Sequence, residues 1–255
     1  MGKSTLDGTK TSREWAQANP KVVVFPIGAF EQHSTHLPLA ADDIEADYFG
    51  RFLALELGAA LLPTLNFGTS LEHSGFRGTV SLRPETLMQI VRDIADEVEC
   101  QGFHTMIIVN GHGGNFALTP VVRDINRRDR RLKILLVDFW RFADEELLES
   151  HSRGILDLHS SEFETSLFLA LHPELVRTDR PDMRPRVRGF QQPDLTTFGV
   201  SYFAPKGALG RPSCASATKG QKIIASIKRN MLRHVRQRLA WLQKNRHYSG
   251  KGQTR

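Results

Sequence analysis

Cysteine and long apolar runs are scarce in this sequence. Its two cysteines, Cys100 and Cys214, lie far apart and in no metal-type spacing, which argues against a disulfide scaffold and a thiolate zinc site. Cys100 ends a helix-like stretch, so we expect it to be a small buried side chain. No apolar run approaches the ~20 residues of a membrane span, and residues 1–15 lack the apolar core of a secretory signal. These absences predict a protein of the reducing cytoplasm.

Charge is unevenly distributed along the chain. Eleven of the 34 Lys and Arg residues, and none of the 28 acids, fall between Lys219 and Arg255, so the rest of the chain is mildly acidic. A basic run of this kind can bind nucleic acid or an anionic surface, but no known reader motif accompanies it. We therefore expect a solvated helix face, or a contact with an acidic neighbouring subunit, rather than a nucleic-acid partner.

Apolar periodicity predicts strands that alternate with helices. Strands are predicted at 21–28, 59–65, 104–109 and 133–139. Helices are predicted at 42–58, 84–101, 115–127, 161–171 and 217–243, and residues 177–216 remain unassigned. This order predicts one α/β domain over residues 21–243, with three α/β/α layers around a mainly parallel sheet. An N-terminal extension, 1–20, would precede it and a disordered basic tail, 244–255, would follow it.

Three polar clusters lie at or beyond the ends of predicted strands. EQHSTH follows VVVFPIG, NGHGGN follows HTMIIV, and DLHSSEFETS follows ILLVDFW after a variable stretch. Ligands of open α/β sheets bind beyond the carboxyl ends of the strands, so the three loops should share one rim. Together they supply imidazoles and carboxylates without cysteine, a set that suits zinc, manganese or iron.

The first two clusters contain four candidate metal ligands. Glu31 and His33 are two apart in an extended segment, so both can face one centre. Asp42, at a helix start, could return to the same place, and a carboxylate can bridge two cations. His112 lies in NGHGGN, whose glycines permit close backbone approach. Taken alone, that segment could equally be a plain turn or an anion nest, but it is no P-loop, because no Lys-Ser/Thr follows the glycines.

The third cluster offers two glutamates and a histidine. Glu162 and Glu164 point ~200° apart on a helix, so only one can face the site. We predict that Glu162 is the metal ligand and that Glu164 is an outer hydrogen-bond partner or structural. If His159 is not a ligand, it stands where a general acid/base would stand.

The motifs EQHSTHLPLAAD, NGHGGN and HSSEFETSLFLALHP, in this order, resemble the creatininase (creatinine amidohydrolase) family, as do LEHSGFRGTVSL and GRPSCASATKG. The resemblance covers about residues 21–244. It implies a cytoplasmic, often hexameric α/β metallohydrolase with two divalent cations that cleaves C–N bonds. It also implies that Glu31, His33, Asp42 and His112 are metal ligands, with Asp42 bridging. His159 would be catalytic, moving the proton as a metal-bridged hydroxide attacks the carbonyl.

Departures from the family motif bear on the substrate. Creatininases proper have a Tyr and a metal-binding Glu where this chain has Gly113 and Gly114, and a Trp at the position of Ile155. We expect Glu162 to replace the missing ligand, while the aromatic box for creatinine is absent. The predicted substrate is therefore a small cyclic amide, formamide or similar molecule, and not creatinine.

Further substrate contacts are predicted at Gly113, Gly114, Glu72, His73 and Trp140. Glu72 and His73 belong to a polar loop, 69–84, that could cover a substrate, although an ordinary loop is nearly as well supported. Two alternatives stay open. One is a peptidase of a modified peptide, as in one branch of the family, and the other is a catalytically silent scaffold that holds metal structurally.

Overall fold

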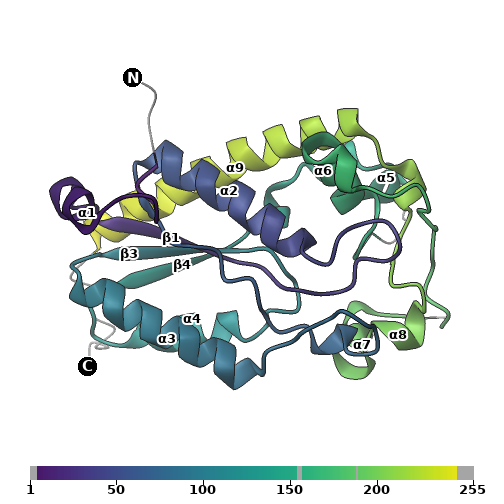
Figure 1. Ribbon diagram of the computed structural model, residues 1–255, viewed down its shortest axis with the longest axis horizontal. Coiled ribbons are helices and arrows are strands. Elements are labelled where there is room, and N and C mark those ends of the chain that lie inside the picture. Colours follow the sequence, from purple (N-terminus) through teal and green to yellow (C-terminus); the bar gives the residue numbers. More distant parts are fainter. Residues whose placement is uncertain (1–4, 154–156, 188, 246–255) are drawn as a thin grey trace, which may run out of the picture.

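The computed structural model describes residues 5–153, 157–187 and 189–245. Its sheet has four parallel strands in the order β2-β1-β3-β4 (Figure 1). Their bounds are β1 Val22–Ile27, β2 Ala60–Leu61, β3 Thr105–Asn110 and β4 Lys133–Asp138. In register, Ile27 pairs with Asn110 and Asn110 with Asp138, so three strands end along the same edge.

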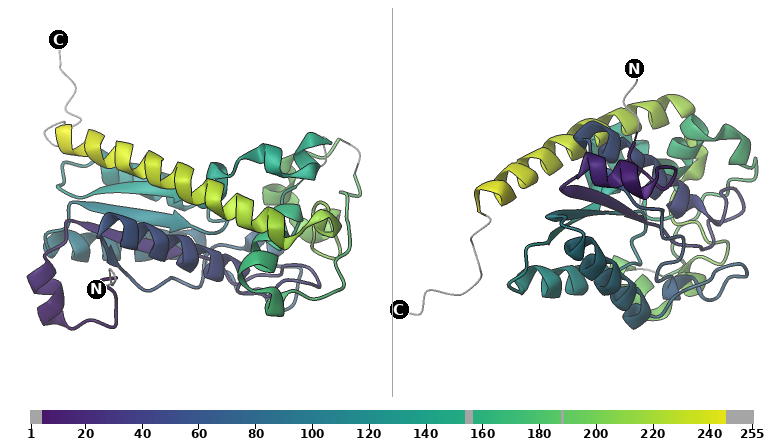
Figure 2. Two further views of the ribbon diagram at one scale, coloured as in Figure 1. Left: turned by 90° about the horizontal axis from the view of Figure 1, so that it is seen from above. Right: turned by 60° about the vertical axis from the view of Figure 1, so that its left-hand side comes forward.

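Helices cover both faces of the sheet, which confirms the three-layer prediction. One layer contains α2 (Ala41–Leu57) and α9 (Ala217–Lys244), and the other contains α3 (Pro84–Cys100) and α4 (Leu118–Arg127) (Figure 1). Strand side chains alternate between the layers: Val23 and Phe25 pack with α3 and α4, whereas Val24 packs with α2 and α9. Figure 2 shows α9 running along the length of the sheet.

Short elements gather at the carboxyl edge of the sheet. The helix α6 (Glu162–Leu171) packs on α9. The other short helices there are α5 Glu149–Ser152, α7 Gln192–Phe198 and α8 Val200–Phe203, whereas α1 Ser12–Ala18 lies at the opposite end of the sheet (Figure 1). The 3-10 turns are η1 Leu71–His73, η2 Phe139–Phe142, η3 Glu145–Leu147, η4 Pro173–Leu175 and η5 Pro212–Cys214. The unassigned segment 177–216 thus supplies α7 and α8, which lie against η1 beyond the strand ends.

Residues ahead of the first strand pack on the domain. Leu6 pairs with Ala60 at the sheet edge, and the Trp15 ring meets Phe103 edge-on at 6.4 Å. Both Leu6 and Trp15 cover the core under α3 and α4. The stretch predicted as an extension therefore contributes apolar contacts from residue 6 onward.

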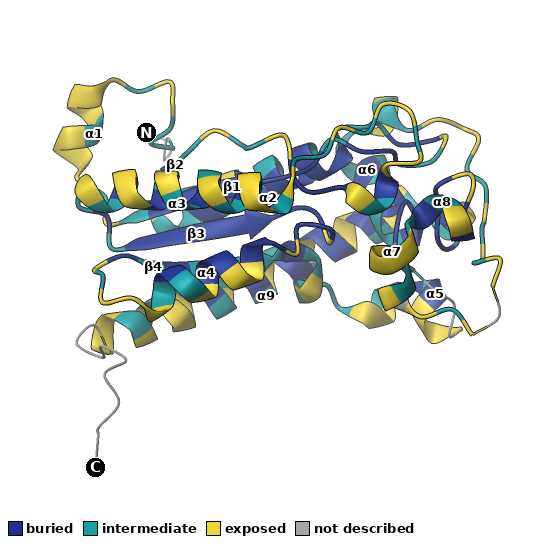
Figure 3. Cartoon of the chain, turned by 90° about the horizontal axis from the view of Figure 1, so that it is seen from below, coloured by how far each residue is buried: buried dark blue, intermediate teal, exposed yellow. Residues whose placement is uncertain are grey.

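Buried residues lie in the sheet and on the helix faces that cover it, and exposed residues lie on the outer faces of the helices (Figure 3). The α3 helix buries a stripe at three- and four-residue spacing, Leu87, Val91, Ala95 and Val98. Cys100 falls off this stripe and is exposed, so the expectation that it is buried was wrong. Among the described residues, no helix combines the length and the hydropathy needed to cross a bilayer.

Candidate metal centre

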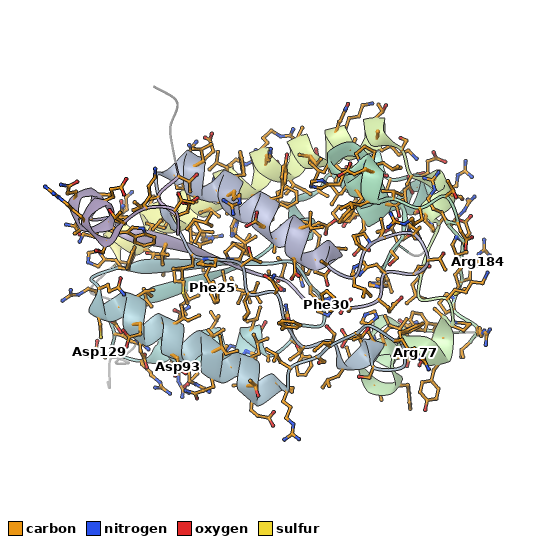
Figure 4. All side chains as sticks on the ribbon, in the orientation of Figure 1. Phe25, Phe30, Arg77, Asp93, Asp129 and Arg184 are labelled. Carbon is orange, nitrogen blue, oxygen red and sulfur yellow. The ribbon has the colours of Figure 1, made fainter. Side chains whose placement is uncertain are left out.

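The loops that follow β1 and β3 are joined at the carboxyl edge of the sheet. Gly111 N–H donates to the Ile27 carbonyl at 2.8 Å. The Asn115 amide donates to the Gly28 carbonyl at 3.1 Å and accepts from Thr69 N–H at 2.8 Å. In Figure 4, Phe25 lies in the sheet and Phe30 lies beyond the strand end, one residue before Glu31. Side chains from three separate loops are therefore held at one place.

A cluster of acids and imidazoles lies at this edge. We call it the metal centre, and it consists of Glu31, His33, Asp42, His112 and Glu164. Two groups of three offer ligand atoms within 4.8 Å of one another: Glu31 with Asp42 and His112, and His33 with Asp42 and Glu164. A third group joins Glu31, His33 and His159. All of these residues are buried except Glu164, which is half-buried.

Asp42 lies between the two groups that share it. Its Oδ1 is 3.3 Å from His33 Nε2, and its Oδ2 is 3.3 Å from His112 Nδ1. It is the second residue of α2, whose amino end has no side-chain cap and favours an ionised carboxylate. One carboxylate oxygen thus faces each group, the arrangement of a bridging ligand.

Several buried polar atoms of the metal centre have no hydrogen-bond partner among the described residues. They are both carboxylate oxygens of Glu31, His33 Nε2, Asp42 Oδ2 and His112 Nε2. The Nδ1 of His33 lies 3.2 Å from the Glu31 carbonyl, which can only accept, so Nδ1 holds a proton and Nε2 is the nitrogen whose lone pair would bind a metal in the neutral ring. Converging unsatisfied oxygens and lone pairs are costly unless a cation binds them. These residues therefore fit a divalent metal.

The charged groups of the metal centre shift one another's pKa. Burial disfavours the charged form of His33, but the Asp42 carboxylate outweighs it and raises the pKa of His33 to about 10. Burial also opposes charge on His112, yet Glu31 and Asp42 raise its pKa well above the ordinary value. Burial raises the pKa of Glu164 to about 7, although His33 acts against the shift. A bound cation would displace such protons.

Glu162, the predicted ligand, lies outside the metal centre. Its Oε1 accepts from Lys219 Nζ at 2.6 Å and from Glu149 N–H at 3.0 Å, and its Oε2 accepts from Ser150 N–H and Oγ–H at 2.8 and 2.7 Å. The Lys219 ammonium, on α9, thus forms an ion pair with the Glu162 carboxylate. Glu164, two residues on, faces the metal centre instead and accepts a hydrogen bond from Ser160 N–H. The choice between the two glutamates was wrong, although the inference that only one can face the site holds.

The predicted general base, His159, borders the metal centre. Its Nε2 lies 2.8 Å from the Gln32 carbonyl, and its Nδ1 lies 3.8 Å from Glu31 Oε1. Its ring is 4.5 Å from that of His33. Burial, with the nearby His33 charge, lowers the pKa of His159 well below its ordinary value, so the imidazole is neutral.

Four of the five predicted substrate contacts lie at the metal centre. Glu72 Oε1 is 3.3 Å from His112 Nε2, and His73 Nε2 is 3.1 Å from Glu31 Oε1. No side chain fits at Gly114, because a Cβ there would collide with the Glu72 carboxylate and with His112 Nε2. Gly113 is exposed, with open space where a side chain would be.

Trp140, the fifth predicted contact, lies elsewhere. It meets Phe139 edge-on at 5.6 Å and packs in the apolar layer between the sheet and α9. These contacts place Trp140 on the α9 side of the sheet, and its contact with a substrate stays a prediction. A position just past a strand end does not fix which layer the side chain enters. Ile155, the other position compared with a family Trp, falls outside the described residues.

Two buried polar residues at the site were not predicted. Gln32 contacts His73, His159 and the Gly207 carbonyl, and its place between Glu31 and His33 was a usable signal. Glu45 is also buried, and burial, with Glu164 and Asp42 nearby, raises its pKa well above the ordinary value. Its spacing of three from Asp42 on α2 could have indicated the shared face.

Known proteins are similar to this chain in sequence and in fold. The family model for creatinine amidohydrolase matches residues 9–235. A mycofactocin precursor peptide peptidase of Mycobacterium ulcerans is 32% identical over 86% of both chains, and a creatinine amidohydrolase of Pseudomonas putida is 30% identical over 88% of this chain and 93% of its own. The solved structure "Creatininase Mn" has a TM-score of 0.77 at 25% identity, covering 92% of this chain and 99% of its own. The chain belongs to the creatininase family.

Proposed function

We propose that this chain hydrolyses an amide C–N bond with two divalent cations. Glu31, Asp42 and His112 would hold one, and His33, Asp42 and Glu164 the other. The observation that carries this proposal is Asp42, which turns one oxygen toward each group. Zinc, manganese and iron suit the ligand set.

The chain's own residues supply the proton transfer. Cations bound here would lower the pKa of a water molecule and polarise the scissile carbonyl. His159, neutral and with Nδ1 directed at the metal centre, would take the proton of the attacking water. It would then give this proton to the nitrogen that leaves as the C–N bond breaks. A catalytically silent scaffold would not need such a base beside the ligands.

The proposed substrate is a small cyclic amide or formamide other than creatinine. Gly113 leaves open space where creatininases proper have a Tyr, so the substrate box differs. A modified peptide is the second candidate, because Leu71 and Phe116 are 49% and 51% exposed on loops that Thr69 and Asn115 tie together. Such an apolar, open rim suits a longer substrate, and the Mycobacterium relative is named as a peptidase.

Elemental mass spectrometry on wild type, Asp42→Ala and the matched control Asp47→Ala would test the centre. Asp47 lies on the same helix but pairs with Arg51 at the surface. We expect about two ions per chain in wild type and in Asp47→Ala, and markedly fewer in Asp42→Ala. A panel of lactams, formamides and short peptides then separates the two substrate classes. A wild-type chain that takes up no zinc, manganese or iron would overturn the proposal.

We also propose a cytoplasmic homo-oligomer, a hexamer by the family resemblance. Light scattering coupled to size-exclusion chromatography would measure the mass against the 28.7 kDa chain. A monomer at micromolar concentration would contradict the oligomer.

A further inference from the structure

The Gln32 side chain joins three segments beside the metal centre. It is buried, and its Oε1 accepts from Ser34 N–H at 2.9 Å, which fixes the other amide atom as the donor. This Nε2 lies 2.8 Å from His73 Nδ1 and 3.3 Å from the Gly207 carbonyl. Both amide protons therefore have an acceptor.

Gln32 determines which nitrogen of His73 carries the proton. Because Nδ1 accepts from the amide, the single proton of a neutral imidazole must be on Nε2. The Nε2–H lies 3.1 Å from Glu31 Oε1, at the inner edge of the site.

Gln32 also fixes the tautomer of His159, through its backbone carbonyl and not through its side chain. His159 Nε2 is 2.8 Å from the Gln32 backbone carbonyl, where a lone pair would be repelled, so Nε2 carries the proton. The lone pair is then on Nδ1, 3.8 Å from Glu31 Oε1. Gln32 Nε2 is also 3.0 Å from His159 Nε2, but its protons are already used by His73 and Gly207. The two imidazoles lie side by side, with centroids 4.4 Å apart.

We propose that Gln32 is a positioning residue that makes His73 a hydrogen-bond donor and His159 a base. This inference rests on the proposed hydrolysis. As water adds to the carbonyl carbon, the C=O π pair moves to oxygen, which accepts a hydrogen bond from His73 Nε2–H without proton transfer. The water proton goes to His159 Nδ1. The oxygen pair then re-forms the C=O bond, the C–N bond breaks with its electron pair going to nitrogen, and nitrogen takes the proton from His159.

The side chain at position 32 can be changed without removing its backbone carbonyl. Gln32→Glu is nearly isosteric but replaces the donor to His73 with an acceptor, so the His73 proton should move to Nδ1 while His159 is unaffected. His73→Phe removes both nitrogens, and His73→Gln restores an N–H near the Nε2 position. Gln17→Glu, on exposed α1, is the matched control.

Long-range ¹H–¹⁵N spectra of ¹⁵N-histidine-labelled chain report the tautomers directly. Signals would be assigned with His73→Phe and His159→Phe. We expect the Nε2–H tautomer for both histidines in wild type and the Nδ1–H tautomer for His73 in Gln32→Glu. An unchanged His73 signal in Gln32→Glu would overturn the role of Gln32, whether or not a substrate is known.

Kinetics on any amide that the chain cleaves test the donor role of His73. Loss of one oxyanion donor costs about 10²- to 10³-fold in kcat, so we expect this loss in Gln32→Glu and in His73→Phe, with ion content and KM close to wild type. The double variant, Gln32→Glu with His73→Phe, should lose no more kcat than either single variant. His73→Gln should recover most of the rate. Additive losses, or wild-type kcat in His73→Phe, would contradict the proposal. A wild type without ions or activity would instead refute the proposed function.

Discussion

Two buried acidic clusters flank the start of α6, and they differ in what neutralises them. The anchor cluster consists of Glu162, Lys219, Glu149 and Ser150, and every oxygen of the Glu162 carboxylate is hydrogen-bonded there. In the metal centre, Glu31 faces only imidazoles among the described residues: its Oε1 lies 3.1 Å from His73 Nε2, and its Oε2 lies 2.9 Å from His112 Nε2. A buried carboxylate needs a counter-charge. The anchor cluster takes it from the chain's own α9, and the metal centre is built to take it from solution.

The largest expected effect separates the two glutamates of α6. Glu164→Gln should weaken the second cation site by more than about 100-fold, because even outer partners of ligands are worth 10–100-fold, and kcat should fall with it. Glu162→Gln, the matched variant two residues away, should keep about two ions per folded chain. Isothermal titration with the metal would measure both. Equal ion loss in the two variants would abolish the distinction between the clusters.

Removing the ammonium of the anchor cluster should destabilise the fold and leave the metal centre intact. Lys219→Met leaves Glu162, which is 0% exposed, without a cation, and breaking a buried pair in this way costs about 3–5 kcal/mol. We expect the free energy of unfolding in urea to fall by roughly 3 kcal/mol. The ion content of the folded fraction should stay at the wild-type value. A stable variant that has lost its ions would reverse the assignment of Lys219.

The variants at Glu162, Glu164 and Lys219 test contacts that the sequence could predict only in part. Glu31, His33 and His112 follow apolar strands directly, and parallel strand ends meet at one edge, so their convergence is readable from spacing. The orientation of α6 is not readable in this way. Its two glutamates are local neighbours, but the residue that decides between them, Lys219, lies 57 positions from Glu162. Only packing of α6 against α9 brings the pair together.

The elements were predictable for a related reason. The β1 and β3 strands are buried on both faces, so they appear in the sequence as unbroken apolar runs. Such runs can be recognised from the local sequence alone. The helices α7 and α8 are seven and four residues long, too short for a helical period to emerge. Their position depends on η1, which they contact. Long-range contacts, and not local propensity, determine this part of the rim.

A further variant tests by pH the carboxyl group of Asp157, which lies beside Glu162 and Ser150 of the anchor cluster. Burial, with Glu162 nearby, raises the pKa of Asp157 to about 6 from its ordinary 3.8. A raised pKa in the folded state gives stability that is present below pH 3.8 and lost as pH rises through about 6. Asp157→Asn should therefore stabilise the chain at pH 8, by about 3 kcal/mol, and the gain should shrink toward zero near pH 4. Urea unfolding at pH 4, 6 and 8 measures it, and a pH-independent difference would contradict the titration.

The smallest effect concerns backbone strain, which also distinguishes the clusters. Among the described residues, Asn19, Ser34 and Ser160 are the non-glycine residues with positive φ, and the last two border the metal centre. Ser160 has φ +47° and presents its N–H to Glu164. A non-glycine residue in this region costs about 1 kcal/mol or more. Ser160→Gly keeps the N–H and should raise the free energy of unfolding by up to about 1 kcal/mol, with ion content unchanged. Ser160→Ala, which keeps the Cβ and loses the hydroxyl, should give no gain, and an equal gain in both variants would assign the effect to the buried hydroxyl instead.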